Sequence, residues 1–123
     1  MNELTFPEKF LFGTAVASYQ VEGGIYNNDW TIWENKFNSV CVEPCYEACK
    51  HYEMLDQDIE LLKELGIKAF RFSIEWSRIE PTEGNFDTDA INHYVEKAKK
   101  LIANNISPII TCLLYTSDAA DDL

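Results

Sequence analysis

The stretch AFRFSIEW (Ala69–Trp76) alternates between two kinds of side chain. Every second residue is large and apolar: Phe70, Phe72, Ile74 and Trp76. The residues between them are small or polar: Ala69, Arg71, Ser73 and Glu75. Successive side chains of a strand point to opposite faces, so the pattern predicts one face against helices and one of small and polar groups. An open sheet covered on both sides would carry large apolar residues on both faces, so the alternation favours a (β/α)8 barrel with polar groups towards its lumen.

The charged pair on the polar face raises a question of partners. Arg71 and Glu75 are four strand residues apart, which places their Cα atoms about 13 Å from each other. That separation is too long for a direct contact. Because a buried charge is costly without a partner, Arg71 is expected to need an anion that its own strand does not provide.

Strand and helix patterns alternate along the whole chain. Strands are predicted at 10–18, 67–74 and 107–115, with an irregular stretch at 19–49 and a loop at 75–86. A helix is predicted at 51–66, with Gly66 ending it and an apolar face made of Leu55, Ile59, Leu62 and Leu65. A second helix, capped by Asp87 or Asp89, has the apolar face Ile91, Tyr94, Val95, Ala98, Leu101 and Ile102. This order predicts a parallel sheet with an open edge, and therefore a piece of a larger barrel.

Composition excludes several function classes. The 123 residues carry a net charge of −11, which disfavours nucleic acid and anionic membrane surfaces as partners. No apolar run approaches the roughly 18 residues of a membrane span. The first ten residues lack a basic region followed by an apolar stretch, so the chain is expected to be cytoplasmic. The sequence predicts nothing about oligomeric state.

Three of the four cysteines fall in CVEPCYEAC, at Cys41, Cys45 and Cys49. A metal site, with His51 as a further ligand, would prefer cysteines two residues apart. Free thiols in a loop or short helix are the favoured interpretation, and no metal and no cofactor are predicted.

Two long motifs carry a family resemblance. FLFGTAVASYQVEGG (residues 10–24) is similar to the N-terminal signature of glycoside hydrolase family 1, the β-glucosidase and 6-phospho-β-glucosidase family. DIELLKELGIKAFRFSIEWSRIEP (residues 58–81) is similar to the family's next block. The resemblance covers roughly residues 5–111. It implies a TIM barrel that hydrolyses small-molecule β-glycosides with retention, and it leaves open whether the substrates are glucosides or 6-phosphoglucosides.

The resemblance also implies roles for particular residues. Retaining hydrolysis uses two carboxyl groups about 5–5.5 Å apart, and the family places these glutamates in Asn-Glu-Pro and Glu-Asn-Gly motifs, which this sequence lacks. Both catalytic glutamates are therefore expected beyond the end of the chain, the chain alone is predicted to be inactive, and Glu22 and Glu75 are not assigned as catalytic. Gln20 matches the glutamine that binds the hydroxyls of the non-reducing sugar. Arg71 matches the arginine that contacts and orients the nucleophilic glutamate, which would be its missing partner.

The sequence departs from the family after the third predicted strand. The sequence matches the family's Thr-x-His-His type sequence through Thr111, and Leu113 and Leu114 then stand where its histidines would be. The predicted domains are accordingly a partial barrel at 1–111 and an atypical, non-native tail at 112–123.

Several alternatives stay open at this point. Trp30 and Trp33 either stack on a sugar or pack a loop, and Arg78 and Lys68 are interpreted as surface or structural charges. A non-catalytic carbohydrate-binding partial barrel is the alternative function. A small doubly wound binding domain is disfavoured, because no phosphate-binding glycine loop follows the first strand.

Overall fold

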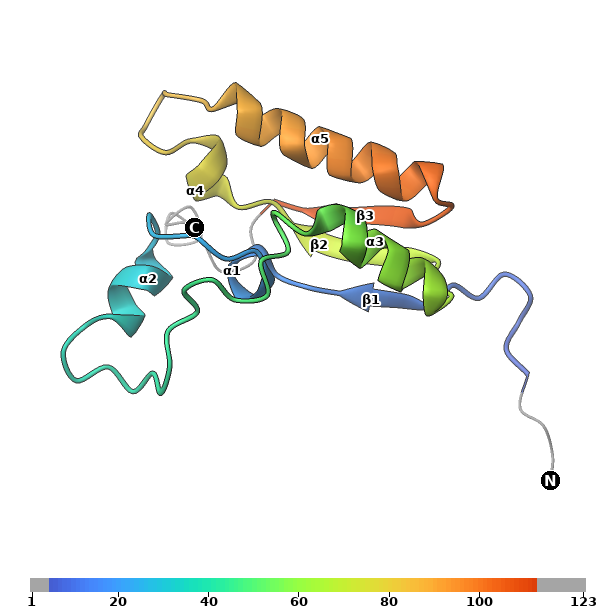
Figure 1. Ribbon diagram of the computed structural model, residues 1–123, viewed down its shortest axis with the longest axis horizontal. Helices are drawn as coiled ribbons and strands as arrows, with labels where there is room; N and C mark the ends of the chain where they lie inside the picture. Colours follow the sequence, from blue (N-terminus) through green and yellow to red (C-terminus); the bar gives the residue numbers. More distant parts are fainter. Residues whose placement is uncertain (1–4, 113–123) are drawn as a thin grey trace, which may run out of the picture.

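The computed structural model describes residues 5–112, and a three-stranded parallel sheet lies at its centre (Figure 1). The strands β1 (Gly13–Ala15), β2 (Ala69–Ser73) and β3 (Ser107–Thr111) are hydrogen-bonded in that order. Both pairs are parallel, with Ala15 opposite Arg71 and Arg71 opposite Ile109. The carboxyl ends of all three strands therefore meet at one edge of the sheet.

Two longer helices connect the strands and cover one face of the sheet. α3 (Leu55–Glu64) precedes β2, and Gly66, at a φ of 71°, lies just beyond its end as predicted. α5 (Thr88–Ala103) runs along β2 and β3 (Figure 1). Its N-cap is Asp87, whose Oδ1 accepts hydrogen bonds from the backbone of Asp89 and Ala90 at 2.9 and 3.0 Å. The sequence left Asp87 and Asp89 as alternatives, and the structure selects Asp87.

The core lies between this sheet face and the helices. It consists of residues from α3, β2, α5 and the connecting segments: Leu55, Ile59, Leu62, Phe70, Phe72, Ile79, Tyr94, Leu101 and Ile106. The predicted packing of Phe70 and Phe72 against the helices is thus confirmed. The predicted helix faces are only partly right, because Leu65, Val95 and Ile102 are exposed. On α5 the buried stripe runs through Tyr94, Lys97 and Leu101, so a lysine occupies a core position.

Three short helices occupy segments that the sequence assigned to other structure. α1 (Ser18–Val21) begins where the first strand was predicted to end, and β1 itself has only three residues. α2 (Asp29–Glu34) lies in the stretch predicted as irregular, and Asn28 caps it by accepting a hydrogen bond from the Thr31 backbone. α4 (Trp76–Ile79) lies in the predicted 75–86 loop, so Trp76 belongs to a helix rather than to the strand. One-turn helices are too short to leave a periodic pattern in the sequence.

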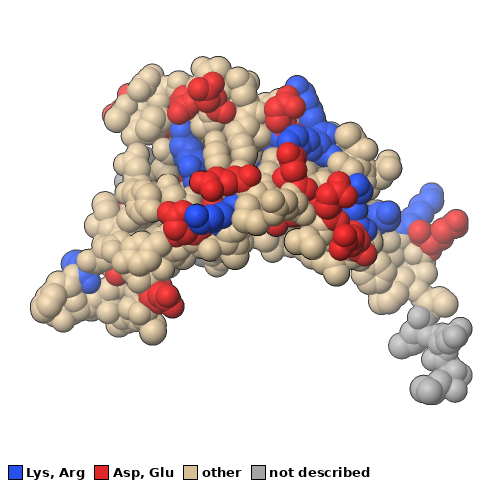
Figure 2. Space-filling model, viewed as in Figure 1, with Lys and Arg blue, Asp and Glu red and all other residues tan. Residues whose placement is uncertain are grey.

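Surface charges of both signs are mixed over the helices on the face shown in Figure 2. Lys63 pairs with Glu60 at 2.8 Å and Lys99 with Glu96 at 2.7 Å, while Lys100 joins α5 to Asp56 on α3. None of the helices within residues 5–112 is long and apolar enough to cross a membrane. The predicted change of character at 112–123 lies outside the described residues, apart from Cys112.

Candidate functional site

The motifs single out two residues, one just beyond the carboxyl end of β1 and one in the middle of β2. β1 leads through Val16 and Ala17 into α1, which carries Gln20. The side chain of Arg71 lies on the same face of the sheet as Ala15 and Ile109, its register partners. Loops at the carboxyl ends of parallel strands are where α/β barrels place their sites. Gln20 lies in the segment that follows the carboxyl end of β1, whereas Arg71 lies in the middle of β2, on the sheet face of Ala15 and Ile109.

Gln20 is exposed and lies beside a cavity of about 220 Å³. Its lining comes from α1, α2 and residues 41–49, which carry three cysteines and are called the cysteine loop below. The lining residues are Tyr19, Gln20, Trp30, Trp33, Glu34, Cys41, Glu43 and Cys45. Trp30 and Trp33 pack edge to face there, with ring centroids 5.1 Å apart. An exposed amide beside two indole rings offers a donor, an acceptor and apolar surface, which are the groups that bind sugars.

Tyr19, next to Gln20, is one of the residues that line this cavity, and its hydroxyl is held by hydrogen bonds. Its hydroxyl donates a hydrogen bond to Glu34 and lies 3.1 Å from Thr31 Oγ1. Burial and the Glu34 carboxylate raise the pKa of Tyr19 above its ordinary value. Glu34 also accepts hydrogen bonds from the Cys45 backbone, at 3.3 and 3.2 Å. The Glu34 carboxylate thus joins α2 to the segment around Cys45, in the wall of the cavity.

Arg71 is half-buried and has no side-chain hydrogen bond or ion pair with any other residue in the described range 5–112. The nearest carboxylate in its strand direction, Glu75, has other partners. Ser18 Oγ donates to Glu75 Oε2 at 2.9 Å, and Ser77 Oγ donates to Glu75 Oε1 at 2.6 Å. The guanidinium therefore remains available to an anion outside this part of the chain.

Glu22 is the second carboxylate near the site, and it is also enclosed. It accepts from Arg78 Nε at 3.1 Å, and the Tyr94 hydroxyl lies 3.0 and 2.9 Å from its two oxygens. Burial raises the pKa of Glu22, while Lys97, Tyr94 and Arg78 oppose that rise. The carboxylates of both Glu22 and Glu75 are therefore buried and hydrogen-bonded to neighbouring side chains.

Lys97 completes the buried charges. It is 1% exposed, and its ammonium lies 4.1 Å from the centroid of the Phe72 ring. Burial lowers the pKa of Lys97 to about 8, against the attraction of Glu22 and Asp58. The negative charge of the buried Glu22 carboxylate attracts the Lys97 ammonium, which explains how a lysine is tolerated at a core position of α5.

The cysteine loop and His51 do not converge on one point. The four thiols are free, and no cluster of three or more potential metal ligands occurs in residues 5–112. Cys41 Sγ donates to the Glu43 carbonyl at 3.2 Å. His51, proposed above only as an alternative ligand, has its Nδ1 2.5 Å from Asp58 Oδ2, and burial lowers its pKa.

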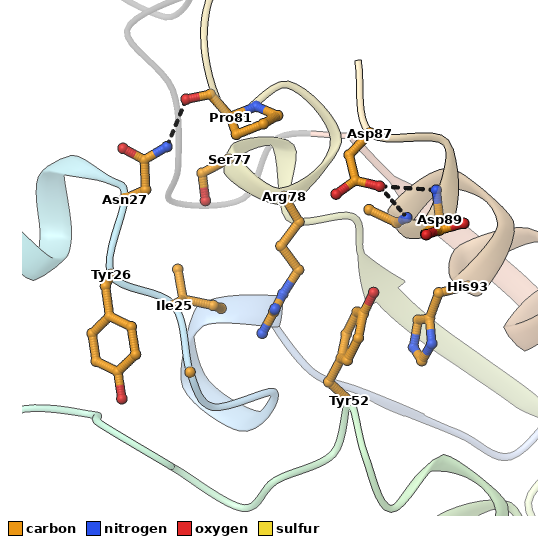
Figure 3. Close-up of a pocket in the computed structure, with 12 residues that line it drawn as sticks. Ile25, Tyr26, Asn27, Tyr52, Ser77, Arg78, Pro81, Asp87, Asp89 and His93 are labelled. Atoms are coloured by element: carbon orange, nitrogen blue, oxygen red, sulfur yellow. Dashed lines mark hydrogen bonds between the residues drawn. The ribbon is translucent and has the colours of Figure 1, made fainter. Parts of the chain in front are cut away.

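A larger pocket of about 520 Å³ opens elsewhere, between α4, α5 and residues 24–27 (Figure 3). In it the Arg78 guanidinium lies 4.1 Å from the centroid of the Tyr52 ring, and His93 stacks on that ring at 3.6 Å. Gln20 and Arg71 do not line it. Arg78 contacts both Tyr52 in this pocket and the buried Glu22, so we interpret it as a structural charge.

Sequence reasoning missed the polar network beneath α1, which contains Ser18, Ser73, Glu22, Tyr94 and Lys97. Two signals for it were present. Ser73 shares a face with Glu75 in the alternating pattern. Lys97 lies three residues from Tyr94 and four from Leu101, on the helix face that was predicted to be apolar.

Comparison with known proteins gives consistent results. Residues 2–120 match the sequence model of a family described as glycosyl hydrolase family 1. The chain is 38% identical over 131 residues to beta-glucosidase A of Acetivibrio thermocellus, covering 100% of this chain and 29% of that protein.

Solved structures agree with the sequence match. A beta-glycosidase from Pyrococcus horikoshii superimposes with a TM-score of 0.80 at 43% identity, covering 87% of this chain and 25% of the other. Beta-glucosidase from Thermotoga maritima, solved with galacto-hydroximolactam, gives a TM-score of 0.85 at 34% identity, covering 95% and 28%. The chain thus spans less than a third of the length of these relatives.

Proposed function

The chain belongs to glycosyl hydrolase family 1, and we propose that it is the N-terminal part of a longer β-glucosidase. The fold expected from its sequence, the first part of a (β/α)8 barrel, is confirmed. In the proposed enzyme this part supplies two groups. Gln20 binds hydroxyls of the non-reducing sugar, and Arg71 orients the nucleophilic glutamate contributed by a later strand.

One observation carries the proposal. Gln20 is exposed beyond the carboxyl end of β1, and Arg71, in the middle of β2, lacks a partner within residues 5–112, whereas Glu22 and Glu75 are enclosed. Retaining hydrolysis needs two carboxyl groups about 5–5.5 Å apart, one a nucleophile and one an acid and base. The enclosed glutamates do not suit those tasks, so we assign the reacting pair to strands beyond this segment.

The amide of Gln20 suits a sugar contact because it offers a donor and an acceptor to adjacent hydroxyls. A hydroxyl that loses such a partner in a closed site is left unpaired, which weakens binding of the transition state. The cavity beside Gln20, with Trp30 and Trp33 in its wall, leaves room for a ring next to the amide.

The guanidinium of Arg71 suits a carboxylate because its planar fork forms two parallel hydrogen bonds. It would hold the nucleophile in one orientation and lower the pKa of that carboxyl, so that it is ionised while the neighbouring acid stays protonated.

The test is hydrolysis by the full-length protein that contains this segment. We expect it to hydrolyse an aryl β-glucoside, with the β-anomer of glucose as the first product seen by proton NMR. A parallel assay with the aryl 6-phospho-β-glucoside decides between the two substrate classes. Release of the α-anomer first, or no hydrolysis of either substrate, would contradict the proposal.

A further inference from the structure

The element that carries Gln20 has little stability of its own. α1 spans four residues, and no side chain caps its first turn. An isolated helical turn is unstable in water because nucleation is costly. The direction of the Gln20 side chain therefore depends on what holds the two ends of α1.

The N-terminal end of α1 is held by buried hydroxyls and by Glu75. The Ser18 backbone donates to Ser73 Oγ at 2.7 Å, and Ser73 Oγ lies 3.1 Å from Ser18 Oγ. Ser18 Oγ in turn donates to Glu75 Oε2, and Glu75 is 0% exposed. These contacts fix the first residue of α1 to the end of β2.

The C-terminal end of α1 is held by Glu22, its C-cap, which is 2% exposed. Glu22 receives hydrogen bonds from Arg78 and Tyr94, and Arg78 also donates to the Gly23 carbonyl. The Val21 carbonyl accepts from the His51 backbone at 2.9 Å. Arg78 of α4 and Tyr94 of α5 thus both hydrogen-bond to the segment that follows Gln20.

One hydroxyl joins the two ends. Tyr94 accepts a hydrogen bond from the Glu75 backbone at 3.1 Å and donates to Glu22. Burying two carboxylates is costly, and both have hydrogen-bond partners here: Ser18 and Ser77 for Glu75, and Arg78 and Tyr94 for Glu22. Buried polar networks of this kind fix one arrangement when every member has a partner.

We propose that Glu75 and Glu22 are positioning residues that hold α1, and with it Gln20, from its two ends for sugar binding. This inference rests on the sugar contact proposed for Gln20. Neither carboxylate touches the substrate; each acts through the turn that carries the amide.

The first test is a double-mutant cycle in the full-length protein. Ser18→Ala removes the link from α1 to Glu75 and leaves Glu75 in place. We expect it to lower kcat/KM for an aryl β-glucoside roughly tenfold. In a Gln20→Ala background the same change should cost less than about twofold, because the two residues act as a unit. Equal fold-losses in both backgrounds would overturn the inference, as would an unchanged rate in the single variant.

Rescue by a conservative variant separates positioning from acid catalysis. Glu75→Gln keeps an oxygen that accepts from Ser18, whereas Glu75→Ala removes it. Positioning predicts that Glu75→Gln retains most of the activity that Glu75→Ala loses. Equal losses in the two variants would mean that the ionised carboxylate itself is needed. Ser107→Ala, at an exposed serine at the other end of the sheet, is the matched control.

A measurement without substrate separates this inference from the proposed function. Backbone hydrogen exchange of the 17–24 segment should accelerate in Ser18→Ala and in Tyr94→Phe, and stay unchanged in Ser107→Ala and Tyr26→Phe. If Gln20→Ala keeps the wild-type rate, the sugar contact is refuted. If exchange of this segment is unchanged in Ser18→Ala and Tyr94→Phe, the network does not hold α1, whatever Gln20 does.

Discussion

Adjacent glycines provide a strict test of how the segment after α1 is held. Gly23 and Gly24 have φ values of 75° and 65°, in the left-handed region. An alanine there costs about 1–2 kcal/mol for its backbone conformation alone. Their surroundings differ, because a Cβ on Gly23 would lie 2.1 Å from the Glu47 carbonyl oxygen, whereas a Cβ on Gly24 would meet nothing within 4 Å.

Gly23→Ala must therefore displace the cysteine loop, while Gly24→Ala need not. The displacement breaks the 2.9 Å hydrogen bond from the Gly24 backbone to the Tyr46 carbonyl, worth about 1 kcal/mol, and strains the bond from Arg78 to the Gly23 carbonyl. We expect Gly23→Ala to lower the free energy of unfolding by about 2–3 kcal/mol and Gly24→Ala by about 1–2 kcal/mol. Urea titration of the full-length protein measures both. Losses within about 0.5 kcal/mol of each other would refute the packing described here.

Three other predictions follow from the site and the surface. Arg71→Met should move the acidic limb of the kcat/KM pH profile of the full-length protein to higher pH, because the pKa of the nucleophile would rise. Arg71→Lys should also be strongly impaired, because lysine lacks the planar fork. An unmoved acidic limb would mean that Arg71 is only a structural charge. The 123-residue chain alone should show no hydrolysis of an aryl β-glucoside and should bind the dye ANS, since Val95 and Ile102 are exposed on α5; enzyme-like hydrolysis would contradict the division of roles. Burial lowers the pKa of His93 from 6.5 to about 4. As pH falls through that range the unfolded chain binds the proton before the folded one does, so stability is lost. The melting temperature should therefore fall less between pH 6.5 and pH 4 in His93→Gln than in the wild type, and equal falls in the two proteins would exclude the effect.

Local rules predicted the parts of the fold that depend on neighbours in sequence. The alternation around Phe70 and Phe72 identified the face that packs against helices, because a strand reverses its side chains at every residue. Gly66 and Asp87 marked a helix end and a helix start through backbone conformation and capping, which need only nearby atoms.

The missed features depend on contacts between distant segments. α1 is too short to show a period, and Ser18 reaches Ser73 across 55 residues and Glu75 across 57. Lys97 resembles a surface residue in the sequence, and its burial depends on a carboxylate on Glu22, far from it along the chain. The motifs predict roles for Gln20 and Arg71, but the network around α1 became visible only in the structure.

The most direct test of the account is the effect of Gln20→Ala on kcat/KM in the full-length protein. Gln57→Ala is the matched control, because Gln57 is an exposed glutamine on α3. We expect Gln20→Ala to weaken transition-state binding of an aryl β-glucoside by a few kcal/mol, since a buried sugar hydroxyl loses its partner, and Gln57→Ala to leave it unchanged. A change of less than about threefold in kcat/KM for Gln20→Ala would contradict the assignment of this edge of the sheet as the sugar-binding site.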